Sequence, residues 1–173
     1  MATDTQDGYG LVSKTFHWVM ALLVGWQFLK FFDRIDEGEH WVGQTLVSWH
    51  ISIGVLLLVM AVTRFGWALN QRGQRPLNDP AMDFYIKAGH GLIYATLILL
   101  PLTGIMLMVG AGFGVTAFGV ELIAKGEKIG WAQSLGSLHS PLAWILAALV
   151  IGHIAMALFH QFVRRDGTLD RML

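Results

Sequence analysis

Long apolar segments set the first limit on how this chain can fold. Four of them are long and apolar enough to cross a bilayer, and they cover approximately residues 13–32, 42–65, 84–109 and 138–163. Only helices and closed barrels satisfy their backbone hydrogen bonds inside lipid, and these segments lack the alternation of barrel strands. We therefore expect an all-α membrane protein, a four-transmembrane-helix bundle that forms a single domain over residues 1–173.

The composition agrees with a membrane protein and excludes several kinds of site. Hydrophobic residues make up 54% of the 173 residues and charged residues only 14%, whereas a soluble domain of this size needs more polar surface. The absence of cysteine excludes disulfides, thiolate zinc sites, cysteine-bound iron–sulfur clusters and covalent c-type haem. The net charge of zero gives no indication of nucleic-acid binding. The polar, acidic start MATDTQDGYGLVSK does not look like a cleaved signal peptide.

The basic residues beside the segments predict their orientation. Basic residues gather between the second and third segments and after the fourth segment, at Arg72, Arg75, Arg164, Arg165 and Arg171. The connection between the first two segments is acidic, with Asp33, Asp36, Glu37, Glu39 and one histidine, His40. Because basic flanks stay in the cytoplasm, both termini are expected there.

Histidines are the ionisable residues that stand out in these segments. Six of the seven lie in an apolar segment or at its end, where ionisable groups are costly and usually functional. His139, His153 and His160 follow one another at intervals of fourteen and seven residues, which return a helix to nearly the same face. Fourteen residues rise roughly 21 Å, about the spacing of two planar cofactors stacked across a bilayer. Taken singly, each histidine is better explained by a headgroup-level position or a bond to a neighbouring helix, and only the set of them favours a function.

The predicted topology sorts four histidines into two pairs. His50 and His139 lie in the outer half, and His17 and His153 lie toward the cytoplasm. Small residues four positions after each would leave room for a flat ring, namely Ala21, Gly54, Ala143 and Ala157. A metal route or a proton-coupled transporter would need carboxylates at mid-depth, and the segment interiors contain none. Paired neutral imidazoles in hydrocarbon fit the iron of b-type haem best.

With these residues in place, the sequence resembles the bacterial cytochrome b561 family, small four-helix membrane proteins that carry two b haems. The resemblance covers nearly the whole chain and follows in order YGLVSKTFHW, HISIG, KAGHGLIY, PLTG, LHSPLAW, GHIAMALFH and RRDGTLDRML. It implies that His17, His50, His139 and His153 are axial ligands of the iron of two haem b groups. It also implies a multi-pass protein of the bacterial inner (cytoplasmic) membrane.

The resemblance implies electron transfer and leaves two functions open. In the relatives known as superoxide oxidases, electrons from superoxide outside pass through both haems to ubiquinone. On that interpretation the chain is a superoxide:ubiquinone oxidoreductase with membrane lipid and quinone as partners. Other relatives are cytochrome b subunits that anchor a hydrogenase or another dehydrogenase and relay electrons for a redox protein partner. The acidic residues of the outer connections would not attract an anion such as superoxide.

The remaining polar residues near the cytoplasmic ends have two interpretations each. His90 and His160 are candidates for a quinone site, since a quinone headgroup needs a hydrogen-bond donor and a proton source near neutral pH. Interfacial histidines that cap helix ends are an equally good explanation. Four basic residues are candidates for binding haem propionates or are simply solvated, namely Arg64, Arg72, Arg75 and Lys87.

Overall fold

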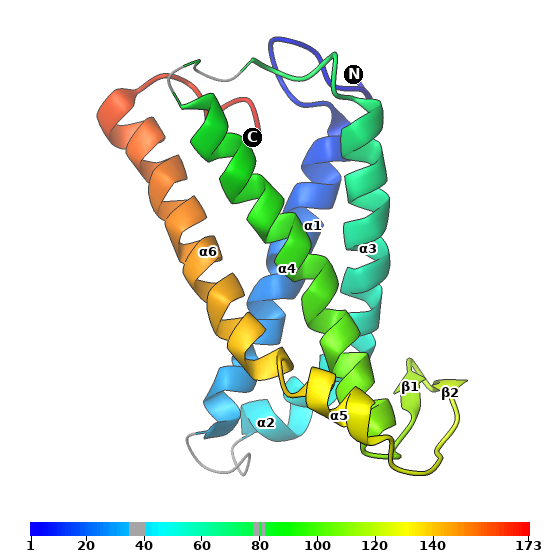
Figure 1. Cartoon of the computed structure of the whole chain (residues 1–173). Coiled ribbons are helices and arrows are strands. Elements are labelled where there is room, and N and C mark those ends of the chain that lie inside the picture. The colour runs from blue at the N-terminus through cyan, green and yellow to red at the C-terminus, as the bar shows by residue number, and fades with distance from the viewer. Residues whose placement is uncertain (35–40, 78–79, 81) are drawn as a thin grey trace.

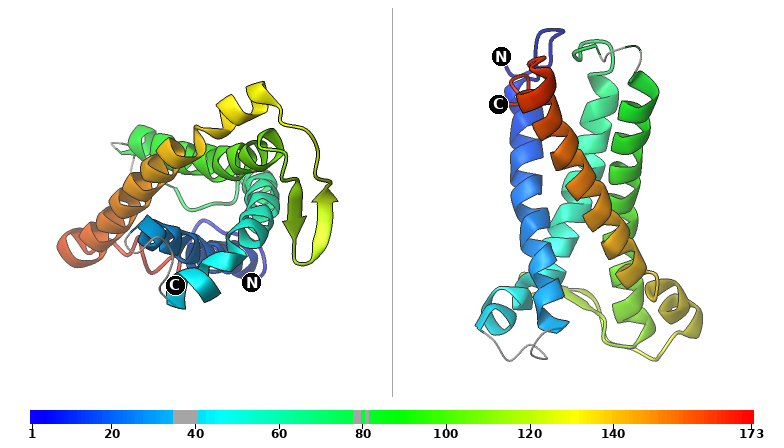
Figure 2. Two further views of the ribbon diagram at one scale, coloured as in Figure 1. Left: turned by 90° about the horizontal axis from the view of Figure 1, so that it is seen from below. Right: turned by 90° about the vertical axis from the view of Figure 1, so that its left-hand side faces the viewer.

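Four long helices form a bundle in the computed structural model of the chain, which describes residues 1–34, 41–77, 80 and 82–173 (Figure 1). They are α1 (Leu11–Phe28), α3 (His50–Asn70), α4 (Asp83–Gly110) and α6 (His139–Phe159). Seen end-on in Figure 2, the helices form a ring in which α1 neighbours α3, α3 neighbours α4 and α4 neighbours α6. Both termini lie at one end of the bundle.

Shorter elements cover the two ends of the bundle. The end opposite the termini carries the 3₁₀ helices η1 (Leu29–Arg34) and η2 (Val47–Trp49), α2 (Trp41–Thr45), the strands β1 (Val115–Ala117) and β2 (Val120–Ile123), and α5 (Gly130–Gly136). At the other end, α6 continues into a π-helical turn, η3 (His160–Arg164).

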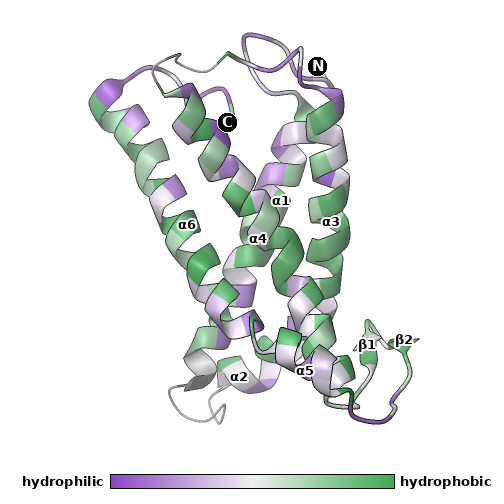
Figure 3. Ribbon diagram, viewed as in Figure 1, coloured by the Kyte–Doolittle hydropathy of each residue, from purple (hydrophilic) through white to green (hydrophobic). Residues whose placement is uncertain are grey.

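The expectation of a helical membrane bundle is confirmed in its general form. Among the described residues, three helical stretches are long and apolar enough to cross a membrane, Trp41–Asn70, Asp83–Gly110 and Gly130–Arg164. Figure 3 shows that the apolar residues follow the middle of the long helices. The first predicted segment forms α1, which packs against α3. Helix α1 is not among these three stretches, because Lys14, His17 and Gln27 interrupt its apolar residues and lower its mean hydropathy below theirs.

The second predicted segment, residues 42–65, differs most from the observed helix. It starts in α2, passes through η2, and continues as α3 to Asn70. A hydrogen bond of 2.9 Å from Trp26 Nε1 to the Leu46 carbonyl oxygen fixes the bend to α1. At the other end, Trp67 Nε1 donates to Ser13 Oγ at 2.9 Å. These contacts join distant residues, so an apolar run alone does not reveal them.

The connection from α4 to α6 contains a β-hairpin that the sequence analysis did not predict. Strands β1 and β2 pair antiparallel around a two-residue turn, Phe118–Gly119, whose φ angles are 52° and 79°. Two positive φ values are typical of the type I′ turns that suit tight hairpins. The Phe118 backbone N–H donates to Ser52 Oγ at 3.0 Å, which ties the hairpin to α3. Strands of three and four residues are too short to give a clear alternating pattern.

Helix α5 is pressed closely against the end of α4. A Cβ atom built on Gly110 would lie 2.3 Å from the Gln133 backbone nitrogen, and one on Gly136 would lie 2.5 Å from Leu107 Cα. Only glycine allows two backbones to approach so closely. Since α5 leads directly into α6, this contact sets where His139 begins the last long helix.

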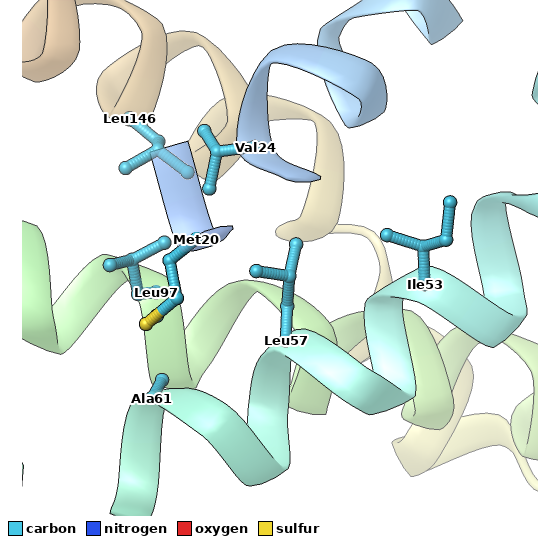
Figure 4. Close-up of a cluster of buried hydrophobic side chains, with 7 residues drawn as sticks. All are labelled: Met20, Val24, Ile53, Leu57, Ala61, Leu97 and Leu146. Atoms are coloured by element: carbon cyan, nitrogen blue, oxygen red, sulfur yellow. The ribbon is translucent and has the colours of Figure 1, made fainter. Parts of the chain in front are cut away.

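The hydrophobic core is a layer at the middle of the bundle, to which every long helix contributes (Figure 4). This mid-bundle layer consists of Met20, Val24, Ile53, Leu57, Ala61, Leu97 and Leu146. Leu146 is the one buried residue of α6 and lies seven residues from His139 and seven from His153. The layer therefore separates two levels of the bundle, each with its own histidines.

Candidate functional site

His50 and His139 mark the level of the bundle nearer the end opposite the termini, the end predicted from the sequence to be the outer one. Each is the first residue of its helix, α3 and α6, and both side chains are half-buried. Their ring centres are 6.0 Å apart and their ring planes are nearly perpendicular, at 87°. The close packing of α5 on α4 delivers His139 to this position. The structure therefore brings together the two histidines that the sequence analysis assigned to the outer level.

The inner level is marked by His17 of α1 and His153 of α6. Their ring centres are 6.1 Å apart, with an angle of 56° between the ring planes. Both residues are half-buried. These are the two histidines that the depth argument placed together, and they lie on the far side of the mid-bundle layer from His50 and His139. Helix α6 contributes one histidine to each level.

The separation within each pair suits one iron ion between two imidazoles. A metal–nitrogen bond is about 2 Å long, and the nitrogen lies about 1 Å from its ring centre, so two opposed ligands have ring centres roughly 6 Å apart. The observed distances are 6.0 Å and 6.1 Å. The distance between ring centres therefore fits an iron cofactor held by each pair. An apolar groove on α1 contains none of the histidines and is lined by Ala21, Leu22, Gly25, Trp26, Leu29 and Leu46.

Gly54 was expected to leave room for a flat ring beside His50, but in the structure that space is taken by another side chain. A Cβ atom on Gly54 would lie 3.2 Å from Gln27 Nε2, so the side chain of Gln27 occupies that space. The same Nε2 donates to the His50 carbonyl oxygen at 2.9 Å. Gly54 therefore makes room for Gln27, which holds the start of α3 against α1.

His139 is held by α4, and sequence reasoning missed the residues that hold it. Its Nδ1 donates to the Leu100 carbonyl oxygen at 2.9 Å. A Cβ atom on Gly104 would lie 2.9 Å from the His139 Cε1 atom, so only glycine lets the ring lie this close to α4. A neutral imidazole that donates from Nδ1 keeps its Nε2 lone pair for a metal, and metal-binding histidines usually make such a bond. The PLTG motif, which the sequence analysis used only as part of the family resemblance, was the available signal.

His17 has a different neighbour, the guanidinium of Arg64 on α3. Arg64 Nη2 lies 3.1 Å from His17 Nδ1. Because a guanidinium only donates, His17 Nδ1 accepts this hydrogen bond. Arg64 also lies over the ring of Tyr94, with its Cζ 5.6 Å from the ring centre, as in cation–π contacts. Arg64 is thus the basic residue that adjoins the inner pair.

The other basic residues considered for propionates lie elsewhere. Arg75 Nε is 3.1 Å from Oδ2 of Asp4, whose side chain is fully buried, and Lys87 Nζ is 2.6 Å from Asp83 Oδ2. Arg72 is exposed at the end of α3. Arg75 and Lys87 therefore form ion pairs at the end of the bundle that carries the termini.

His90 lies beside the inner pair. Its ring centre is 5.4 Å from that of His153, and its Nδ1 donates to the Ile86 carbonyl oxygen at 2.9 Å. The residue is exposed on α4. In its neutral form the free Nε2 can accept a hydrogen bond, and in its protonated form it can donate one. This position puts an ionisable group next to His153.

His160 is buried and joins the C-terminal tail. Its Nδ1 lies 2.6 Å from Asp166 Oδ2, and Arg164 Nε lies 3.5 Å from the same oxygen. The other carboxylate oxygen accepts from the Thr168 hydroxyl at 2.6 Å and from the Thr168 backbone N–H at 3.1 Å. Hydrogen bonds from Thr168 and His160 hold the pKa of the Asp166 carboxyl well below its usual range. His160 is therefore part of a charged network at the end of α6.

The end of the bundle opposite the termini, predicted to be the outer one, is only partly described. Lys125, Glu127 and Lys128 are exposed between β2 and α5, Glu121 is exposed in β2, and Lys30 is exposed in η1. The predicted acidic loop, with Asp36, Glu37, Glu39 and His40, falls in residues 35–40, outside the described part of the chain. The described outer charges are therefore mixed in sign.

An apolar helix bundle with paired histidines at two levels has the organisation of a membrane-bound b-type cytochrome. The sequence profile of the prokaryotic cytochrome b561 family matches residues 8–173, and the chain belongs to this family. Haem, electron transport and oxidoreductase function go with the family, so the chain is an integral membrane electron-transfer protein that binds haem b.

Several bacterial proteins match along nearly their full length. Cytochrome b561 homolog 2 of Escherichia coli (strain K12) is 31% identical, over 99% of this chain and 94% of the relative. The probable superoxide oxidase CybB of Yersinia pestis is 29% identical, over 95% of each chain. Cytochrome b562 of Cereibacter sphaeroides is 26% identical, over 97% of this chain and 96% of the relative. The similarity therefore extends over nearly the whole chain.

Proposed function

We propose that the chain is a di-haem b membrane cytochrome that carries electrons from a donor outside the membrane to ubiquinone near its inner side. This proposal rests on the two histidine pairs. Within each pair the ring centres are 6.0 Å or 6.1 Å apart, and the two histidines that α6 contributes, His139 and His153, are fourteen residues apart. His50 and His139 are the proposed axial ligands of the outer haem. His17 and His153 are those of the inner haem.

The residues of the chain would hold each haem and keep water away. Two bound haems supply one-electron redox chemistry at two depths. The Nδ1 bond to the Leu100 carbonyl oxygen orients His139 and leaves its Nε2 for the iron. If His17 held the iron through Nε2, its ring proton would have to lie on Nδ1, and Arg64 could then no longer donate to that atom. Arg64 would instead be available to pair with a haem propionate.

The proposed site where electrons pass from the inner haem to ubiquinone lies at His90 and His160. Ubiquinone takes up two electrons and two protons to become quinol, so its site needs a proton donor beside the inner haem. His90 Nε2 is suited to that role because the ring lies 5.4 Å from His153 and Nδ1 is already bonded to Ile86. His160, bonded to Asp166 at 2.6 Å, would pass protons from the tail.

Superoxide is the proposed outer donor. Each superoxide that loses one electron becomes dioxygen, so two superoxide anions reduce one ubiquinone. A relative named probable superoxide oxidase, 29% identical over 95% of this chain, supports this choice. Lys125 and Lys128 are exposed on the outer surface and offer positive charge to an anion.

A second function rests on the β-hairpin. In this alternative the chain is an anchor subunit that relays electrons for a hydrogenase or another dehydrogenase. Every residue of β2 is exposed, and Phe118 at the turn is 54% exposed although it is large and apolar. An exposed apolar hairpin near the outer pair would suit a protein partner.

The two functions are separated by one experiment on the purified protein. Acidified acetone should extract about two haems per chain, because no cysteine holds them covalently. Mixing with a superoxide source and a short-chain ubiquinone should reduce the haems and form quinol, and superoxide dismutase should stop both. Haem reduction only by a co-purified dehydrogenase would favour the anchor subunit. A colourless preparation from haem-replete cells would contradict both.

We also propose four membrane spans, with both termini in the cytoplasm of a bacterial inner membrane. The basic residues at the end that carries the termini support this orientation, because such flanks stay in the cytoplasm. A reporter that is fluorescent only in the cytoplasm should be active when fused after Leu173. A reporter active only outside the membrane should work when inserted after Lys125, and the opposite pattern would reverse the topology.

A further inference from the structure

One turn of α4, from Leu100 to Gly104, surrounds His139 on two sides. Besides its bond within the helix, the Leu100 carbonyl oxygen accepts hydrogen bonds from two side chains, from His139 Nδ1 at 2.9 Å and from the Thr103 hydroxyl at 2.8 Å. Gly104 lies against the edge of the ring, since a Cβ atom there would be 2.9 Å from Cε1 and 3.1 Å from Nδ1. Thr103 is buried, at 8% exposure, so water does not replace its hydroxyl.

The two side-chain donors on the Leu100 carbonyl oxygen compete for the same electron density. When a carbonyl accepts from the Nδ1–H of a metal-binding histidine, the imidazole becomes a stronger electron donor to its metal. A second donor on the same oxygen weakens that hydrogen bond. The hydroxyl of Thr103 therefore makes His139 a weaker electron donor than the carbonyl alone would make it.

We infer that the Leu100–Gly104 turn is a positioning element for His139, and that the Thr103 hydroxyl raises the reduction potential of the outer haem. The inference rests on the proposed ligand role of His139. A weaker electron donor stabilises oxidised iron less, so the potential rises. A higher potential at the outer level favours acceptance of electrons from the outer donor. Neither Thr103 nor Gly104 needs to touch the cofactor for this effect.

The chain provides a matched control for the hydroxyl in the same helix. Thr96 is also buried, at 5% exposure, and its hydroxyl donates to the carbonyl oxygens of Leu92 and Ile93 at 2.9 Å and 3.0 Å. Among the described residues, no histidine bonds to either carbonyl. Thr96→Val and Thr103→Val therefore remove the same group from the same kind of environment, and only Thr103→Val changes a carbonyl that holds a histidine.

The test is a potentiometric titration of the purified, haem-loaded protein with both variants. The outer haem is identified as the one lost in His139→Ala. Thr103→Val should lower the midpoint potential of the outer haem and leave the inner one unchanged, with haem content equal to wild type. Thr96→Val should change neither. If Thr103→Val leaves both potentials unchanged, or shifts both alike, the inference is wrong. If the wild type does not bind two haems, the proposed function itself fails.

A second variant tests the position of the ring. Gly104→Ala places a methyl group against the end of the His139 side chain, so the ring should turn and alter the electron paramagnetic resonance signal of the outer haem alone. Gly66→Ala in α3 is the control, because a Cβ atom there meets nothing within 4 Å. An unchanged signal in Gly104→Ala would contradict the positioning role. Should Gly104→Ala fail to fold, the Thr103→Val comparison still decides the inference.

Discussion

His17 and His153 come from the first and last long helices and face each other with ring centres 6.1 Å apart. Helix α1 packs on α3, α3 on α4 and α4 on α6, so this pair lies where the ring of helices closes. A ligand that binds the folded chain and not the unfolded one stabilises it. Haem at this level would therefore join α1 to α6 as well as carry electrons.

The first prediction concerns the assignment of ligands to levels. His50→Ala and His139→Ala should each lose the same haem, and His17→Ala and His153→Ala should each lose the other. The extracted haem should fall from about two to about one per chain in each case, because one imidazole does not hold a b haem in place of two. The measurement is haem content, with a reduced-minus-oxidised spectrum to identify which haem remains.

His90→Ala is the control for this prediction, because His90 lies 5.4 Å from His153 but is not a proposed ligand. It should keep both haems. Loss of a haem in His90→Ala, with both haems kept in His17→Ala, would transfer the ligand role from His17 to His90. Loss of a haem in His160→Ala but not in His153→Ala would overturn the depth assignment.

The second prediction concerns the transfer of electrons from the inner haem to ubiquinone. His160→Ala should keep both haems but slow quinol formation by roughly 10²-fold, the low end of what a positioned proton donor contributes. Asp166→Asn should slow it less, because His160 remains and loses only its partner at 2.6 Å. The measurement is the rate of quinol formation from pre-reduced protein in a stopped-flow mixer. Equal rates in wild type and His160→Ala would remove His160 from the quinone site.

The third prediction is a pH dependence of the C-terminal tail. The pKa of the Asp166 carboxyl is held below its usual range by hydrogen bonds from Thr168 and His160. A carboxylate with a lowered folded-state pKa stabilises the fold above its unfolded-state pKa, here about pH 4, and loses this contribution as the pH falls further. Amide exchange at Thr168, corrected for the intrinsic rate, should therefore stay slow down to about pH 4 and become faster in stronger acid. Asp166→Asn should remove the transition, and an identical transition in that variant would contradict the assignment.

The fourth prediction concerns the contact between α5 and α4. Gly136→Ala should lower the free energy of unfolding by about 1–3 kcal/mol, because its Cβ would meet backbone atoms of Leu107 that cannot move aside easily. Gly130→Ala in the same helix meets nothing within 4 Å and should change stability by less than about 0.5 kcal/mol. Thermal unfolding in detergent measures both. Since α5 leads into His139, Gly136→Ala should also weaken binding of the outer haem more than that of the inner one.

The sequence was sufficient for the class of protein and for the pairing of the histidines. Apolar length predicts helices in a membrane, because backbone groups in lipid have no other partners. The interval of fourteen residues between His139 and His153 places them on one face of α6, and their depths then select His50 and His17 as partners. The structure brings these pairs together, at 6.0 Å and 6.1 Å between ring centres.

Helix bounds and the β-hairpin depended on contacts that no local pattern contains. The bend at Leu46 is fixed by Trp26, and the end of α3 is held by Ser13. The hairpin turn at Phe118 is held by Ser52. Each contact joins residues that are distant in the chain, so their effect appears only once the helices are packed.

The surroundings of the histidines were decided by the tertiary structure alone. The sequence provided Gly104 and Thr103 as part of a PLTG motif, without any sign that they face His139. Which carbonyl a histidine reaches, and which glycine admits its ring, depends on the rotation and spacing of α4 against α6. Those quantities come from side-chain packing across the bundle, to which residues far apart in the sequence contribute together. Residue types and their periodicity therefore identified the candidate ligands, and helix packing determined how each one is oriented.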